Sequence, residues 1–173
     1  MCAAGPARDE ETIDVFLHPG EYFVGDARHR IATLLGSCVS ITLWHPTQRI
    51  GAMSHFLLGE RKDKAARGRL DPRYGRDAVQ LMLLDLNRLG VVPTECQAKL
   101  FGGGDMFPGH KLAAAVGRDN GEVGRELVRA QGIPIVSESL FGEGHRRIIF
   151  DVSTGDVWAR RSSRSDHSRG RKT

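Results

Sequence analysis

The sequence predicts an α+β or layered α/β domain in which strands are the majority. Short apolar segments recur along the chain, some with clear period-two alternation, and turn-forming residues separate them. Two other segments carry apolar residues at helical spacing. The length of 173 residues and the 40% hydrophobic content suit one globular domain with a sizeable core.

The first half of the chain predicts four strands. Residues 13–17 and 31–35 are short apolar runs that end at turn signals. Residues 39–44 alternate apolar and polar side chains, and residues 50–58 return after a turn centred between residues 46 and 47. We therefore expect the last two segments to form an antiparallel hairpin.

Two helices are expected in the second half. Asp71 is suited to be the N-cap of the first, with Pro72 at the first helical position and Gly90 just beyond its end. Asn120 is suited to cap a second helix, which ends at Gly132. The remaining strands are expected at residues 96–101, 133–138, 146–151 and 157–160, of which the last two form a hairpin.

The domain is expected to span residues 13–160. A flexible lead-in covers residues 1–12, and a basic disordered tail covers residues 161–173. The net charge of +4 comes from the C-terminus, because six basic residues and one acid lie in residues 160–173. The body has no basic face interleaved with aromatic residues, so no specific nucleic-acid binding is expected.

Several other classes of protein do not fit the sequence. No run approaches the ~18 apolar residues of a membrane span, so no membrane insertion is expected. The three cysteines form no CxxC pair, and an odd number suits the reducing cytoplasm. The seven histidines are scattered singly, so no metal site and no cofactor are expected.

Cys38 and His55 are the chemically notable residues of the predicted hairpin. The expected turn would place them directly opposite one another, with Cβ atoms ~5 Å apart. A half-residue shift of the turn would put them on opposite faces, whereas a full-residue shift makes them a diagonal pair on one face. A thiol and an imidazole in reach of each other match a nucleophile and its base. An imidazolium neighbour would lower the pKa of the thiol from its ordinary ~8.5.

Two glycine-containing segments are candidates for supporting this pair. Gly36 and Ser37 directly precede Cys38, where a glycine can take unusual dihedral angles and aim backbone N–H groups at an oxyanion. Gly102, Gly103 and Gly104 lack a phosphate-binding pattern and indicate a tight loop that allows close backbone approach. From the residues alone, an inert buried cysteine and a hydrogen-bonded core histidine remain open alternatives.

Three segments of the chain resemble the CheD family of chemoreceptor glutamine deamidases. They are residues 33–39 (TLLGSCV), 51–58 (GAMSHFLL) and 99–107 (KLFGGGDMF), and the resemblance extends over residues 13–158. It implies hydrolysis of glutamine side-chain amides on methyl-accepting chemotaxis receptors. It also implies a β-sandwich flanked by helices, like the catalytic domain of cytotoxic necrotizing factor, and in some bacteria a CheC-type phosphatase as a further partner.

The resemblance also implies roles for individual residues. Cys38 matches the family's nucleophile and His55 its general base. The family's orienting threonine stands six residues before the cysteine, where this chain has Ala32. Thr33 is the neighbouring candidate, and strand alternation would turn it to the other face unless the strand corner is bulged.

Three other functions remain as alternatives. The chain could be a regulatory binding module of the receptor array or of a CheC-type phosphatase, with little catalysis. It could be another thiol hydrolase, because acyl transfer to water or to an amine uses the same pair of side chains. The basic tail could bind polyanions weakly.

Overall fold

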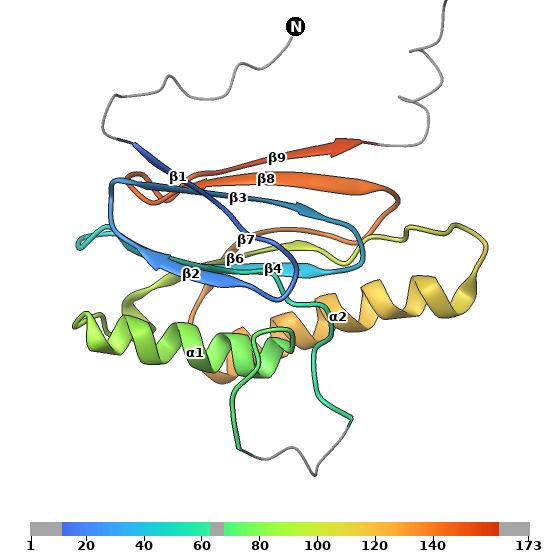
Figure 1. Ribbon diagram of the computed structural model, residues 1–173, viewed down its shortest axis with the longest axis horizontal. Helices are drawn as coiled ribbons and strands as arrows, with labels where there is room; N and C mark the ends of the chain where they lie inside the picture. Colours follow the sequence, from blue (N-terminus) through green and yellow to red (C-terminus); the bar gives the residue numbers. More distant parts are fainter. Residues whose placement is uncertain (1–11, 63–67, 163–173) are drawn as a thin grey trace, which may run out of the picture.

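Two stacked β-sheets with two helices on one side form the fold, as Figure 1 shows for the computed structural model. The structure describes residues 12–62 and 68–162. The α+β class expected from the sequence is confirmed. The elements are β1 (Ile13–Phe16), β2 (Tyr22–Gly25), β3 (His29–Leu35), β4 (Val39–His45), β5 (Ile50–Ser54), α1 (Gly75–Arg88), the 3₁₀ helix η1 (Pro93–Glu95), β6 (Gln97–Gly102), α2 (Lys111–Ala130), β7 (Ile135–Leu140), β8 (His145–Asp151) and β9 (Val157–Ser162).

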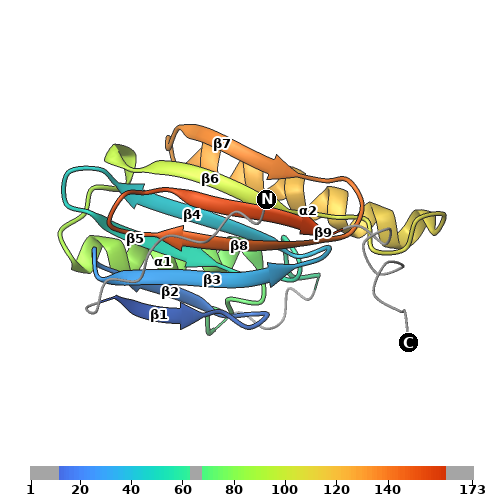
Figure 2. The same ribbon diagram turned by 90° about the horizontal axis from the view of Figure 1, so that it is seen from above.

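The two sheets differ in strand order and direction. The four-stranded sheet has the order β1-β3-β8-β9, and the five-stranded sheet has the order β2-β5-β4-β6-β7. Most neighbours are antiparallel, whereas β1 with β3 and β6 with β7 are parallel. The chain passes from one sheet to the other directly after β3, at the corner that precedes Cys38 (Figure 2).

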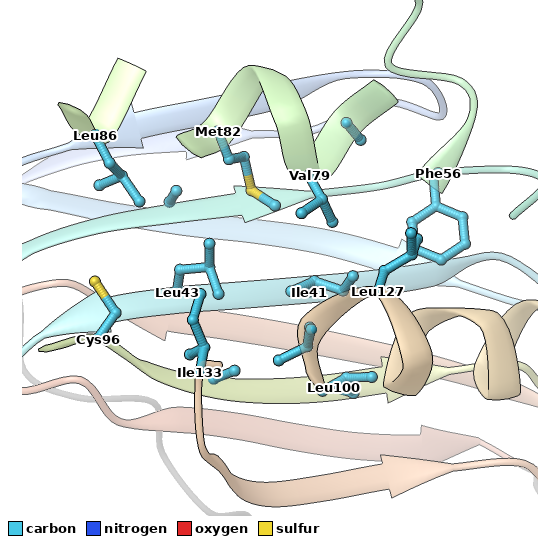
Figure 3. Close-up of a cluster of buried hydrophobic side chains, with 14 of the residues drawn as sticks. Ile41, Leu43, Phe56, Val79, Met82, Leu86, Cys96, Leu100, Leu127 and Ile133 are labelled. Carbon is cyan, nitrogen blue, oxygen red and sulfur yellow. The ribbon is translucent and has the colours of Figure 1, made fainter. Parts of the chain in front are cut away.

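The core has two parts, one on each face of the five-stranded sheet. The outer part lies between this sheet and the helices, where Ile41, Leu43 and Leu100 meet Met82 and Leu86 (Figure 3). The inner part lies between the two sheets, and its buried members are Leu17, Ile31, Leu35, Met53, Phe101, Ile148, Phe150 and Val152. The even and odd positions of β4 therefore face different cores, as the period-two pattern predicted.

Both helices begin at residues other than those expected. The first begins at Gly75 with Tyr74 as N-cap, because the Asp71 carboxylate accepts hydrogen bonds from the Arg73 N–H and guanidinium and closes a turn. Gly90 follows its end with a φ of 77°, as expected. The second begins at Lys111, so Asn120 lies inside the helix and caps nothing.

The strands agree with the predicted ones to within a few residues, with two exceptions. Strand β2 was not predicted. Strand β9 runs to Ser162, so Arg161 and Ser162 belong to the sheet and not to a tail. The rest of the expected tail, and all but the last residue of the lead-in, lie outside the described residues.

Candidate active site

The β4–β5 hairpin places Cys38 and His55 on the same face of the five-stranded sheet. Its register pairs Leu43 with Ala52, and Val39 with Phe56 through hydrogen bonds of 3.1 and 3.0 Å in both directions. Val39 and Phe56 face the helices. Because side chains alternate along a strand, the preceding residues, Cys38 and His55, both point away from the helices. The pair is thus diagonal and not directly opposite. The connection takes up residues 46–49 and ends with Arg49 at a φ of 51°, which moves the turn by one full residue.

His55 is buried between the sheets, and the hydroxyl of Thr33 binds its ring. Thr33 Oγ1 lies 2.7 Å from His55 Nδ1 and also 2.7 Å from the carbonyl oxygen of Leu17. The single hydroxyl proton is donated to the Leu17 carbonyl, so the hydroxyl oxygen accepts from Nδ1–H. The ring therefore has Nδ1 protonated and Nε2 free as a base. Nε2 is buried and has no hydrogen-bond partner among the described residues.

Thr33 faces inward in a regular strand, so the expectation that it points away from His55 is wrong. In β3, Ile31, Thr33 and Leu35 are buried between the sheets. Ala32 is on the outer face, where it pairs with Ile149 of β8. The register of β3 with β8 is continuous from Arg30 to Leu35, and no bulge is needed.

Burial keeps both members of the pair uncharged. Desolvation raises the pKa of the half-buried Cys38 thiol, and a hydrogen bond from its own backbone N–H opposes this in part. Desolvation lowers the pKa of His55 to about 4; Glu21 opposes the shift and His18 adds to it. The lowered thiol pKa expected from an imidazolium neighbour is therefore wrong for the free protein. The thiol and the imidazole on this shared sheet face are therefore both neutral in the free protein.

The triple-glycine loop lies against the backbone of the cysteine corner. The N–H of Gly103 donates to the carbonyl of Cys38, and the N–H of Gly104 donates to the carbonyl of Gly36, both at 2.9 Å. Gly102 has a φ of 109°, and a Cβ there would lie 2.2 Å from the carbonyl oxygen of Cys38. Only glycine therefore allows this approach.

Gly36 and Ser37 have a different environment from the one expected. Gly36 is not among the glycines with positive φ. Its lack of a side chain makes room for Met106 instead, whose sulfur would be 3.0 Å from an added Cβ. The carbonyl of Ser37 accepts a hydrogen bond from the side chain of Asn120.

Three polar residues near the pair were missed by the sequence analysis. Asn120 is 2% exposed and hydrogen-bonds backbone groups beside both Cys38 and His55. Ser40 lies two residues after Cys38 on the same face, and its buried hydroxyl has no partner among the described residues. Arg146 is 1% exposed and donates to the Gly102 carbonyl at 2.8 Å. The contacts of Asn120 and Arg146 are long-range, and no local pattern marks any of the three residues.

The described ranges contain neither a metal-ligand cluster nor a membrane-spanning helix. Within them, no three His, Cys, Asp or Glu side chains gather as a metal ion would require. Neither helix has the length and hydropathy of a membrane span.

Comparison with known proteins assigns the chain to a family. The family model for CheD, described as CheD chemotactic sensory transduction, matches residues 57–161. A probable chemoreceptor glutamine deamidase CheD 2 from Albidiferax ferrireducens is 58% identical over 88% of this chain and 90% of its own length. A CheD 3 of the same description from Dechloromonas aromatica is 46% identical over 88% of this chain and 89% of its own. On this similarity, together with the motifs around Cys38 and His55, the chain belongs to the CheD family.

Proposed function

We propose that this protein hydrolyses the side-chain amide of glutamines on methyl-accepting chemotaxis receptors, giving glutamate and ammonia. The names of its relatives give the substrate class. The observation that carries the chemistry is the contact of Thr33 with His55 Nδ1, which leaves a buried Nε2 on the same sheet face as Cys38 with no partner among the described residues.

The first half of the proposed reaction is acyl transfer to sulfur. Cys38 Sγ attacks the carboxamide carbon of the glutamine while its proton passes to His55 Nε2. The C–N bond then breaks, and the imidazolium returns the proton to the leaving nitrogen, which departs as ammonia. Backbone N–H groups at Gly36 and Ser37 are candidates for stabilising the oxyanion that forms in between.

The second half is hydrolysis of the thioester. Water attacks the thioester carbon while His55 Nε2 takes one of its protons. The C–S bond breaks, the proton returns to sulfur, and glutamate leaves. The Thr33 hydroxyl accepts from Nδ1–H throughout, so it stabilises each imidazolium as it forms.

The neutral resting pair has a kinetic consequence. Desolvation raises the pKa of Cys38 and lowers that of His55, so moving the proton from thiol to imidazole before attack is unfavourable. The proton must move as the C–S bond forms, when the negative charge passes from sulfur to the amide oxygen. A reactive thiolate is thus generated only with a substrate in place.

The family resemblance supports three further proposals. We propose that the catalytic domain spans residues 13–162, since β9 runs to Ser162, and that it resembles the catalytic domain of cytotoxic necrotizing factor, which the two stacked sheets and the Cys-His pair suit. We propose a cytoplasmic location, where the signalling portion of chemoreceptors lies. We also propose a CheC-type phosphatase as a second partner.

The test is incubation with a receptor cytoplasmic fragment that bears glutamines at its modification sites. Wild-type protein should release ammonia and produce the mass increase of –NH₂ replaced by –OH. Cys38→Ala should release none, because no other described cysteine at the site can form the thioester. Cys96→Ala is the matched control and should retain activity, since Cys96 is buried against the helices, in the other core. Full conversion by a folded Cys38→Ala protein would exclude the thiol mechanism.

A further inference from the structure

Asn120 binds the backbone on both sides of the candidate site. Its Nδ2 donates to the carbonyls of Ser37, at 3.0 Å, and Leu57, at 2.8 Å. Its Oδ1 accepts from the N–H of Gly59 at 3.1 Å. Both N–H bonds of the carboxamide are thus used, and one acceptor position as well. An asparagine inside a helix has poor helix propensity, so its place here is explained by these tertiary contacts.

The bond to Ser37 determines how the peptide group before the nucleophile is oriented. The described chain contains no cis peptide bond, so the Ser37 carbonyl and the Cys38 N–H point in opposite directions. Asn120 holds the carbonyl toward α2, and the Cys38 N–H therefore points away from α2. That N–H lies near its own sulfur, where it lowers the pKa of the thiol.

The peptide group after the nucleophile is held by other contacts. The Cys38 carbonyl accepts from Gly103 at 2.9 Å, and the Val39 N–H donates to Phe56 at 3.1 Å. These groups are occupied and unavailable to a substrate. The Cys38 N–H has no backbone acceptor among the bonds of the described residues.

We infer that Asn120 is a positioning residue that fixes the Cys38 N–H as a donor to the oxyanion. This inference rests on the proposed function. When Cys38 Sγ bonds to the amide carbon, the amide oxygen becomes negatively charged. This oxygen and the sulfur are then bonded to the same carbon, so the charge develops close to the sulfur. A donor on the sulfur side of the Ser37–Cys38 peptide is therefore directed at the developing charge. Without Asn120 this peptide group is free to rotate, and the N–H loses its direction.

A role in orienting an oxyanion donor can be separated from a merely structural role. The oxyanion exists only in the transition state and the tetrahedral intermediate. Loss of its hydrogen-bond donor therefore lowers kcat and leaves KM unchanged. Alkylation of Cys38 by iodoacetamide proceeds at a saturated carbon and forms no oxyanion. It reports on the thiol alone. A displaced or unfolded cysteine corner would change both reactions.

The decisive variant is Asn120→Asp. It keeps an acceptor for the Gly59 N–H, but the two hydrogen bonds donated to Ser37 and Leu57 are lost, because a carboxylate oxygen then faces these two carbonyls. Asn120→Gln keeps both donors on a chain longer by one methylene group. Val128→Ala is the matched control: Val128 lies about two turns further along α2, is 1% exposed, and contacts the helix-side core. Each variant is assayed for kcat and KM on the receptor fragment, for Cys38 alkylation, and for thermal unfolding.

We expect Asn120→Asp to lower kcat by about 10²–10³-fold, with KM within about twofold of wild type. The alkylation rate should fall far less than kcat, because the Cys38 N–H contributes only in part to the pKa of the thiol. Asn120→Gln should recover part of kcat. Val128→Ala should lower Tm and leave kcat unchanged. An active wild type with an equally active Asn120→Asp variant would overturn this inference alone, as would parallel losses of kcat and alkylation. If Asn120→Asp does not fold, a folded Asn120→Gln variant with partly lowered kcat and normal alkylation supports the inference, and unchanged kcat overturns it. A wild type that releases no ammonia would overturn the proposed function and this inference with it.

Discussion

Thr33 Oγ1 and His55 Nδ1 lie 2.7 Å apart, and they come from different sheets. Thr33 belongs to β3 of the four-stranded sheet, and His55 directly follows β5 of the five-stranded sheet. The Leu17 carbonyl takes the hydroxyl proton, which makes Thr33 an acceptor for the imidazole. The tautomer of the candidate base therefore depends on how the two sheets pack.

Thr33→Val should lower kcat by about 10²-fold, because the imidazole loses the acceptor that fixes its tautomer and stabilises its protonated form. The buried Leu17 carbonyl also loses its donor, so the free energy of unfolding should fall by about 1–2 kcal/mol. Thr33→Ser retains the hydroxyl and is the control. Steady-state kinetics and chemical unfolding measure the two effects. Wild-type kcat in Thr33→Val would show that His55 needs no orienting group.

The free energy of unfolding should decrease as the pH is lowered through the range in which His55 titrates. Its pKa is about 4 in the folded protein, below the ordinary value of 6.5. The unfolded chain therefore binds more protons between these values, so the free energy of unfolding is highest above pH ~6.5 and falls as the pH approaches ~4. The loss attributable to His55 is of the order of 3 kcal/mol.

His55→Asn isolates this contribution, since the asparagine amide can still donate to Thr33 but does not titrate. Urea unfolding of both proteins between pH 7 and pH 4 gives the difference. A pH dependence that is the same in both proteins would assign the acid instability to other groups.

Iodoacetamide should modify Cys38 before Cys96. Cys38 is half-buried, whereas Cys96 is 1% exposed and its pKa is raised to about 11 by burial and by Glu95. Because burial also raises the pKa of Cys38, its alkylation rate should keep rising above pH ~8.5 instead of levelling off near neutrality. Mass mapping after brief treatment over a pH series measures both. A plateau below pH 7 would indicate a preformed thiolate–imidazolium pair.

Arg146→Met should destabilise the protein by about 2–4 kcal/mol. The buried guanidinium donates to the carbonyls of Gly102, Ser139 and Phe141, and the substitution leaves all three without this donor. Arg146→Lys should recover only part of the loss, because an ammonium lacks the planar fork. Arg147→Met changes the exposed neighbour on β8 and should be nearly neutral. Equal unfolding midpoints for the Arg146 and Arg147 variants would contradict the prediction.

The elements predictable from the sequence are those whose signals are local. The alternation of β4 predicted the hairpin, and the turn expected after it predicted the shared face of Cys38 and His55. The exact register depended on Arg49, whose positive φ lengthens the turn. Nothing in the residue type of Arg49 indicates this backbone conformation. The first half of α2 was missed because Gly117 weakens its helical pattern, while Gly121 and Gly124 weaken the half that was predicted.

Those glycines serve contacts that the local sequence does not reveal. A Cβ on Gly117 would lie 2.6 Å from the carbonyl oxygen of Gly104, and one on Gly121 would lie 2.4 Å from the ring of Phe141. Asn120 likewise lies inside α2 because its side chain hydrogen-bonds backbone groups that are distant in the sequence. Both the helix start and the asparagine are determined by packing between segments far apart in the chain.

The division of the candidate site between two sheets makes catalysis depend on the docking of one sheet onto the other. A chain in which only the five-stranded sheet has formed would already hold Cys38 near His55, but its imidazole would be free to rotate and change tautomer. Docking of β3 supplies Thr33 and at the same time buries the base away from water. A molecule whose sheets have moved apart therefore lacks the oriented base on which the proposed hydrolysis depends.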